Sequence, residues 1–168
     1  RPLELVVADD GSYSGRYAFS HALIQAALYE TLPELRRARL HARVAEEIES
    51  RVRSSSLELA SSLARHFEAG RQPARAIDYL LRAARTASRR FANDTALQHL
   101  EHAAQLVVAL PKEIAAEYEH RLLLDRGHVQ RSSGDMRGAS DSWAALAANA
   151  RDACDSDAEI RALLLLAS

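Results

Sequence analysis

The chain has 168 residues, of which 48% are hydrophobic and 27% are charged. That length and apolar content suffice to bury a core, which excludes a disordered chain and indicates one domain or a short repeat array. The 22 Lys and Arg residues nearly balance the 23 Asp and Glu residues, for a net charge of -1. This balance disfavours direct binding to nucleic acid or to a membrane surface.

The ends of the chain and its single cysteine bear on where the protein works. Residues 1–5 lack the basic flank and apolar stretch of a signal peptide, and Cys154 alone cannot form an internal disulfide. We therefore expect a cytoplasmic location. The chain starts without a methionine and ends on the apolar run 163–167 with no helix stop signal, so we expect a fragment of a longer polypeptide.

The first residues are the only part of the chain whose pattern indicates strands. Residues 3–8 and 17–19 are short extended candidates on either side of the turn-forming run 9–15, which predicts a short N-terminal β-hairpin. From residue 20 onwards the composition is rich in alanine and poor in β-branched residues, and it predicts helices only.

Capping signals delimit the first predicted helices. Ser20 caps a helix over residues 21–30, and Thr31 with Glu34 resembles a capping box for a second helix that ends near residue 51. Ser55 with Glu58 predicts the start of a third helix, which ends at residue 69, before a glycine.

The remaining helices follow from the same kinds of signal. Pro73 starts the fourth helix, and Asn93 or Asp94 caps a fifth that ends near residue 107. Two more are predicted over about 113–132 and 136–151, and Ser156 with Glu159 begins the last one. Because the connections are short, neighbouring helices must pack antiparallel.

The spacing of small and apolar residues predicts how these helices stack. In a unit starting at Ile77, all seven positions that a tetratricopeptide pattern requires are small or apolar, and in a unit starting at His120 most of them are. Trp143 occupies one of these positions, which predicts a core aromatic. We therefore expect an all-α fold of antiparallel helical hairpins stacked as a tetratricopeptide-like right-handed superhelix, with an irregular helical bundle as the alternative.

Several motifs add a family resemblance. Most of it is carried by the runs Tyr-Ala-Phe-Ser-His-Ala-Leu-Ile at 17–24, Ala-x-Tyr-Glu-x-Leu at 27–32 and Arg-Arg-x-x-Leu-His-x-x-Val-Ala at 36–45, and the stretch 64–84 is similar to the first part of the helical array that follows in that family. They resemble the region after the ATPase core in bacterial LuxR-type multidomain signal-transduction ATPases, which are transcriptional regulators. The resemblance implies that residues 1–53 end a winged-helix-like subdomain and that residues 54–168 form a truncated array of tetratricopeptide-like repeats.

The resemblance also implies a function. The chain would be a non-catalytic regulatory module that relays binding of a partner protein or a small anionic effector to ATPase and DNA-binding domains elsewhere in the same polypeptide. A free-standing scaffold for a peptide or protein partner, with a possible homo-oligomer, is the alternative. The phosphate-binding loop is missing and Lys112 is the only lysine, so ATP or ADP is implied for the full-length protein and no cofactor is expected here. His99 and His102 share a helix face without a third metal ligand nearby in sequence, so no metal site is expected.

Two sets of residues are candidates for binding. The resemblance implies that His21 lies near the β-phosphate of ADP in the full-length protein; alternatively, it packs locally beside the Ser20 cap. The second set consists of exposed positions on the first helix of each repeat, which line the concave face: Asp78, Leu81, Arg85, Ser88, Arg89, Arg121, Leu124, His128, Arg131 and Ser132.

Four arginines and a histidine among these positions favour an anionic ligand or an acidic peptide held by guanidinium groups. The alternative is that the arginines only solvate an alanine-rich stack. On either interpretation their charges are expected to be exposed, so Arg85→Ala and Arg131→Ala should barely affect stability. Cys154 is expected to be a half-buried helix residue.

Overall fold

The computed structural model describes residues 2–7, 13–17, 22–51 and 56–167. The chain divides into two compact units, Arg1–Arg39 and Leu40–Ser168, which are described separately. The boundary predicted between residues 53 and 54 lies outside the described ranges, so it stays a prediction.

The first unit contains two strands and a helix. Strands β1 (Pro2–Val7) and β2 (Tyr13–Tyr17) pair antiparallel, with Leu5 opposite Gly15 and an irregularity between Pro2 and Glu4. The turn between them, residues 8–12, lies outside the described part of the chain, and the predicted hairpin stays a prediction. Helix α1 spans Ala22–Thr31 and is followed by α2, Glu34–Arg51, whose residues from Leu40 onwards belong to the second unit.

The predicted capping box between α1 and α2 is wrong. The Thr31 hydroxyl donates to the carbonyl oxygen of Leu28 at 2.7 Å, so Thr31 closes α1 instead of capping α2. The carbonyl oxygen of Pro33 accepts from the backbone N–H of Arg37 at 3.0 Å, which makes Pro33 the residue after which α2 begins.

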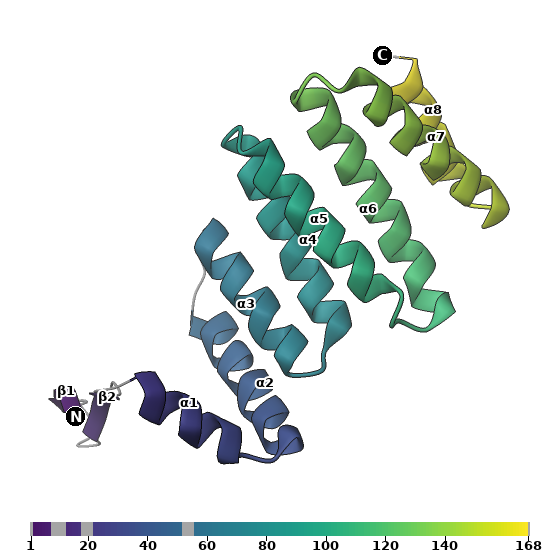
Figure 1. The fold of residues 1–168 in the computed structure, drawn as a ribbon. Helices are drawn as coiled ribbons and strands as arrows, with labels where there is room; N and C mark the ends of the chain where they lie inside the picture. The colour runs from purple at the N-terminus through teal and green to yellow at the C-terminus, as the bar shows by residue number, and fades with distance from the viewer. Residues whose placement is uncertain (1, 8–12, 18–21, 52–55, 168) are drawn as a thin grey trace. The chain divides into compact units, whose positions relative to one another are not determined.

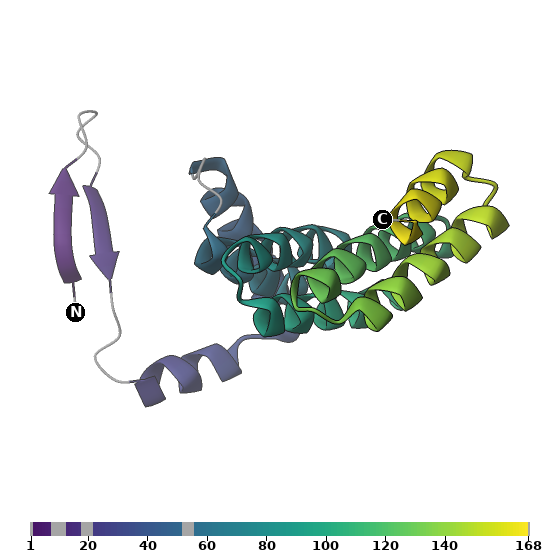
Figure 2. The ribbon, with the colours of Figure 1, turned by 90° about the horizontal axis from the view of Figure 1, so that it is seen from above.

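The second unit is helical throughout its described part (Figures 1 and 2). After α2 come α3 (Leu57–Ala69), α4 (Pro73–Arg89), α5 (Asn93–Val107), α6 (Lys112–Ser132), α7 (Met136–Asp152) and α8 (Ser156–Leu166). From α3 to α8 each helix packs against the next, and α4 also packs against α6. The helices therefore form stacked antiparallel hairpins, in which the first helix of one hairpin contacts the first helix of the next.

Four of the turns in this stack have the same backbone design. In each, one residue adopts a left-handed conformation, and the next N–H bonds to the carbonyl five residues back at 2.8 to 3.0 Å, as in a Schellman motif. The left-handed residues are Arg71, Phe91, Gly134 and Cys154, with φ of 58°, 60°, 87° and 57°. The expected half-buried helical position of Cys154 is therefore wrong, because this residue is exposed in the turn before α8.

Three helices begin one residue away from the predicted cap. Ser56 caps α3, its hydroxyl oxygen accepting from the N–H of Leu59 at 3.1 Å, whereas Ser55 lies outside the described residues. Ala92 precedes α5 and offers no side-chain cap, and Asp155, not the following serine, caps α8. At α3 and α8 the displacement is small because the neighbouring residues carry similar capping chemistry.

The core of the second unit consists largely of alanines with a few large side chains. Ala76, Ala83 and Ala103 are completely buried, which lets neighbouring helices approach closely. Phe67 of α3 stacks on Tyr79 of α4, with ring centroids 5.5 Å apart. The seven core positions predicted for the first repeat unit are all buried, and Trp143, at 4% exposure, is confirmed as a core aromatic.

Polar contacts join α2 to α4 within the second unit. The hydroxyl of Tyr79 donates to Glu49 at 2.5 Å, and Arg75 forms an ion pair with the same carboxylate while its guanidinium lies 4.0 Å from the ring centroid of Phe67. Burial and the Glu49 carboxylate together raise the pKa of Tyr79 to about 12. This tyrosine therefore stays a hydrogen-bond donor across the neutral pH range.

Candidate binding surface

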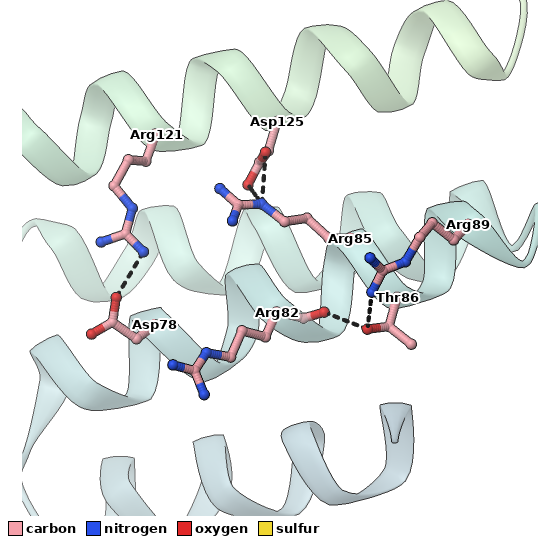
Figure 3. A network of polar contacts seen from close by, with 7 residues as sticks. All are labelled: Asp78, Arg82, Arg85, Thr86, Arg89, Arg121 and Asp125. Carbon is pink, nitrogen blue, oxygen red and sulfur yellow. Dashed lines mark hydrogen bonds and ion pairs between the residues drawn. The ribbon is translucent and has the colours of Figure 1, made fainter. Parts of the chain in front are cut away.

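Two ion pairs of opposite polarity link α4 to α6 (Figure 3). The Nη2 atom of Arg121 on α6 lies 2.8 Å from Asp78 on α4. The second pair lies about one turn further along α6 and two turns further along α4. There, Arg85 on α4 donates through Nε to both carboxylate oxygens of Asp125 on α6, at 2.8 and 3.0 Å. Because the acid lies on α4 in one pair and on α6 in the other, a shift of one helix along the other would bring like charges together.

Asp125 is the buried member of this network. Only 7% of the residue is exposed, and burial raises the pKa of its carboxyl group, although the Arg85 guanidinium acts against that increase. Arg85 itself is about half exposed. Its Nε is engaged by Asp125, whereas its two Nη atoms have no hydrogen-bond acceptor among the described residues. The buried acid therefore orients a guanidinium whose outer donors remain available.

Two further arginines on α4 extend the same surface. The guanidinium of Arg82 lies 4.8 Å from the ring centroid of Tyr79. Figure 3 shows the hydrogen bond of 3.3 Å that Arg89 donates to the hydroxyl of Thr86. Within the part of the chain that the structure describes, neither guanidinium has a carboxylate partner. We name this area the α4–α6 surface; it comprises Asp78, Arg82, Arg85, Arg89, Arg121, Asp125, His128 and Arg131.

Aromatic contacts hold one end of the α4–α6 surface. The ring of His128 meets the edge of Trp143 with centroids 5.6 Å apart, and Arg131 lies 5.1 Å from the centroid of the same indole. Burial and the nearby Arg131 charge lower the pKa of His128, so this imidazole is neutral at pH 7. The positive character of the surface at neutral pH therefore comes from five guanidinium groups set against two carboxylates.

The structure places most, but not all, of the predicted surface residues as expected. Arg85, Arg89, Arg121, His128 and Arg131 lie on the two contacting helices. Leu81 was predicted to be exposed and is 1% exposed, so that prediction is wrong; the exposed neighbour is Arg82. Arg85 is exposed as predicted, but it pairs with a buried acid, so Arg85→Ala is expected to lower stability after all.

The two ion pairs, and Asp125 as a member of one of them, were not predicted, although the sequence carries a signal for them. Asp125 follows Arg85 by 40 residues, and Arg121 follows Asp78 by 43 residues. The two repeat units start 43 residues apart, so Asp78 and Arg121 occupy corresponding positions in adjacent hairpins, whereas Asp125 lies three residues before the position that corresponds to Arg85. Opposite charges separated by one repeat length therefore indicate contacts between first helices.

The histidines considered for metal binding have other partners. His102 lies 3.0 Å from the carboxylate of Glu68, and His99 lies 3.4 Å from the hydroxyl of Ser61. In the described ranges, no three His, Cys, Asp or Glu side chains cluster closely enough to hold a metal ion. His21 lies outside the described residues, and its proposed contact with nucleotide stays a prediction.

Comparisons with known proteins give no match: no family model, no curated protein and no solved structure is similar to this chain. None of the described helices combines the length and apolar character that crossing a bilayer requires.

Proposed function

We propose that this chain is a non-catalytic interaction module that binds an acidic segment of a partner protein across the α4–α6 surface. The observation that carries the proposal is the arrangement around Arg85. A buried carboxylate holds its Nε, both Nη donors lack an acceptor among the described residues, and Arg82 and Arg89 flank it on the same helix. Preorganised guanidinium groups are well suited to bidentate bonds with carboxylates.

The charge distribution favours a short acidic segment over a polyanion. The whole chain carries a net charge of -1, so it generates no long-range field that would attract nucleic acid or an anionic membrane. The surplus of guanidinium groups is local to two helices. A short segment with a few carboxylates matches this local surplus, because it does not need a basic surface that extends over the whole chain.

The proposed architecture is a tetratricopeptide-like right-handed superhelix with the α4–α6 surface on its concave side. Support comes from the contact between the first helices of adjacent hairpins and from the repeated Schellman turns. The resemblance to LuxR-type regulators adds a setting. There, the module would relay partner binding to ATPase and DNA-binding domains of the same polypeptide, and the chain alone should neither hydrolyse ATP nor shift DNA.

The test uses a fluorescein-labelled peptide of eight glutamates and fluorescence anisotropy. The double variant Arg82→Glu/Arg89→Glu should weaken binding by about tenfold or more, since two charge-assisted contacts become repulsive. A matched control, Arg43→Glu/Arg65→Glu, makes the same change in net charge at exposed sites on α2 and α3. Equal weakening by both double variants would show that only net charge matters, and would refute the proposed surface.

A further inference from the structure

Phe91 is an anomaly that the fold does not explain. It is 86% exposed, and it adopts a left-handed backbone conformation with φ of 60° in the turn between α4 and α5. Glycine suits that conformation best. A phenylalanine ring that stays in water also contributes no hydrophobic stabilisation to the fold. The position therefore carries a residue that is unfavourable for folding on two separate grounds.

A second exposed apolar side chain lies in the neighbouring turn. Met136, the first residue of α7, is 62% exposed. The hydroxyl oxygen of Ser132, the last residue of α6, lies 3.0 Å from the side-chain oxygen of Asn93, which brings the end of α6 beside the start of α5. Figure 1 shows the α4–α5 and α6–α7 turns at the same edge of the second unit.

The same two turns carry four arginines. We call this area the turn edge; it comprises Arg89, Arg90, Phe91, Arg131, Met136 and Arg137. Two acids lie nearby: Asp135 accepts from the N–H of Gly138 at 2.9 Å as the cap of α7, and Asp94 lies in the first turn of α5. Arg90 forms an ion pair with Glu58 at 3.7 Å. The edge is therefore basic and apolar together.

We infer that the turn edge anchors a large apolar side chain of the acidic partner segment, with Phe91 and Met136 as the contact. This inference rests on the proposed function and specifies its ligand as an acidic segment with an aliphatic or aromatic residue next to its carboxylates. Arg89 belongs to both areas, so a segment lying on the α4–α6 surface would reach the turn edge without a break. An exposed phenylalanine and a flexible methionine beside guanidinium groups suit such a mixed sequence.

The test compares two labelled peptides of equal length and charge. Each has eight glutamates, interrupted at the centre by two leucines in one and by two serines in the other. We expect the leucine peptide to bind the wild-type chain about fivefold more tightly, because leucine buries apolar surface and serine does not. Phe91→Gly should abolish this preference and leave the affinity for the serine peptide unchanged.

Two variants guard against a trivial explanation. Phe91→Gly removes the side chain while relieving the backbone conformation, so loss of folding cannot account for lost binding. Val108→Ala removes an apolar side chain that is equally exposed, at 87%, from the opposite end of α5, and should keep the preference. Met136→Ala should reduce it in part.

The outcomes separate this inference from the proposed function. The proposed anchor would be overturned if the wild-type chain bound both peptides equally, or if Phe91→Gly still preferred the leucine peptide. In either case the α4–α6 surface would still be supported if Arg82→Glu/Arg89→Glu lost binding of the serine peptide. Binding of the leucine peptide that is insensitive to Arg82→Glu/Arg89→Glu would overturn the proposed function. Failure of both peptides to bind would overturn both.

Discussion

Gly127 and Trp143 occupy one space between α6 and α7: a Cβ atom added at Gly127 would lie 2.1 Å from Nε1 of the indole. The corresponding positions in the preceding hairpin are Ala84 and Leu100, both buried. In the α6–α7 hairpin, glycine replaces the alanine of the first helix and tryptophan replaces the leucine of the second. The larger indole thus fills the space that the missing methyl group leaves. A glycine inside a helix costs about 1 kcal/mol relative to alanine, which burial of the indole offsets.

This relationship predicts an unusual response to a helix-favouring substitution. Gly127→Ala should lower the free energy of unfolding by about 1 to 3 kcal/mol, because the indole must move, although alanine is the better helix former. In a Trp143→Leu background the same substitution should be stabilising, since the pair then matches Ala84 and Leu100. Urea denaturation of the four proteins gives the double-mutant cycle. Equal effects of Gly127→Ala in both backgrounds would contradict the shared-space account.

Phe91→Gly should raise the free energy of unfolding by about 1 kcal/mol, because glycine adopts the left-handed conformation without steric cost. The gain is smaller than the full steric cost, since glycine also loses more conformational entropy on folding. Gly134→Ala, at φ of 87°, should change stability in the opposite direction by a similar amount. Thermal melts of both variants check the pair, and a destabilised Phe91→Gly would mean that the phenylalanine has a structural role.

Arg85→Ala should cost about 1 to 3 kcal/mol of stability, because it leaves the buried carboxylate of Asp125 without a donor. The pKa of that carboxyl group, already raised by burial, should rise further in the variant. Carbon-detected NMR titration of the aspartate side chain measures this change. Arg85→Ala/Asp125→Ala should be less destabilised than Arg85→Ala at neutral pH, and the reverse order would contradict the assignment.

His66 predicts a pH dependence of stability. Burial lowers the pKa of His66, and the nearby His41 and Arg65 lower it further. The Nδ1 atoms of His66 and His41 lie 2.9 Å apart. The unfolded chain therefore binds protons at a higher pH than the folded chain does, so stability falls as the pH drops below about 6.5. His66→Gln should flatten the fall between about pH 7.5 and 5. An unchanged slope of unfolding free energy against pH would exclude this histidine as the cause.

The positions of the helices were predictable from the sequence to within about a residue, because periodicity and stop signals are local properties. Pro73 marked the start of α4 correctly, and Gly70 marked the end of α3. The caps at Ser56 and Asp155 were displaced by one position, since adjacent serines and aspartates offer equivalent oxygens. Left-handed Phe91 could not be predicted, because phenylalanine rarely adopts that conformation and no local signal marks it.

The surface was predicted less completely than the helices. Repeat positions placed four of its arginines and His128 on contacting helices, but the rule that made Leu81 exposed failed because this leucine faces the core. The pairing of Arg85 with Asp125 depends on how two hairpins pack, and helical periodicity describes each helix alone. The number of available guanidinium donors could therefore be counted only in the folded structure.

The most direct test of the central claim is to map where the octaglutamate peptide contacts the chain by ¹⁵N chemical-shift perturbation, including the arginine Nε resonances. If the peptide binds at the α4–α6 surface, one common affinity should describe the shifts of the Nε signals of Arg82, Arg85 and Arg89 and of the backbone amides of α4 and α6. Signals from α2 and α3 should not shift. Saturable shifts centred on α2 or α3, or no shift at all on α4 and α6, would contradict this claim.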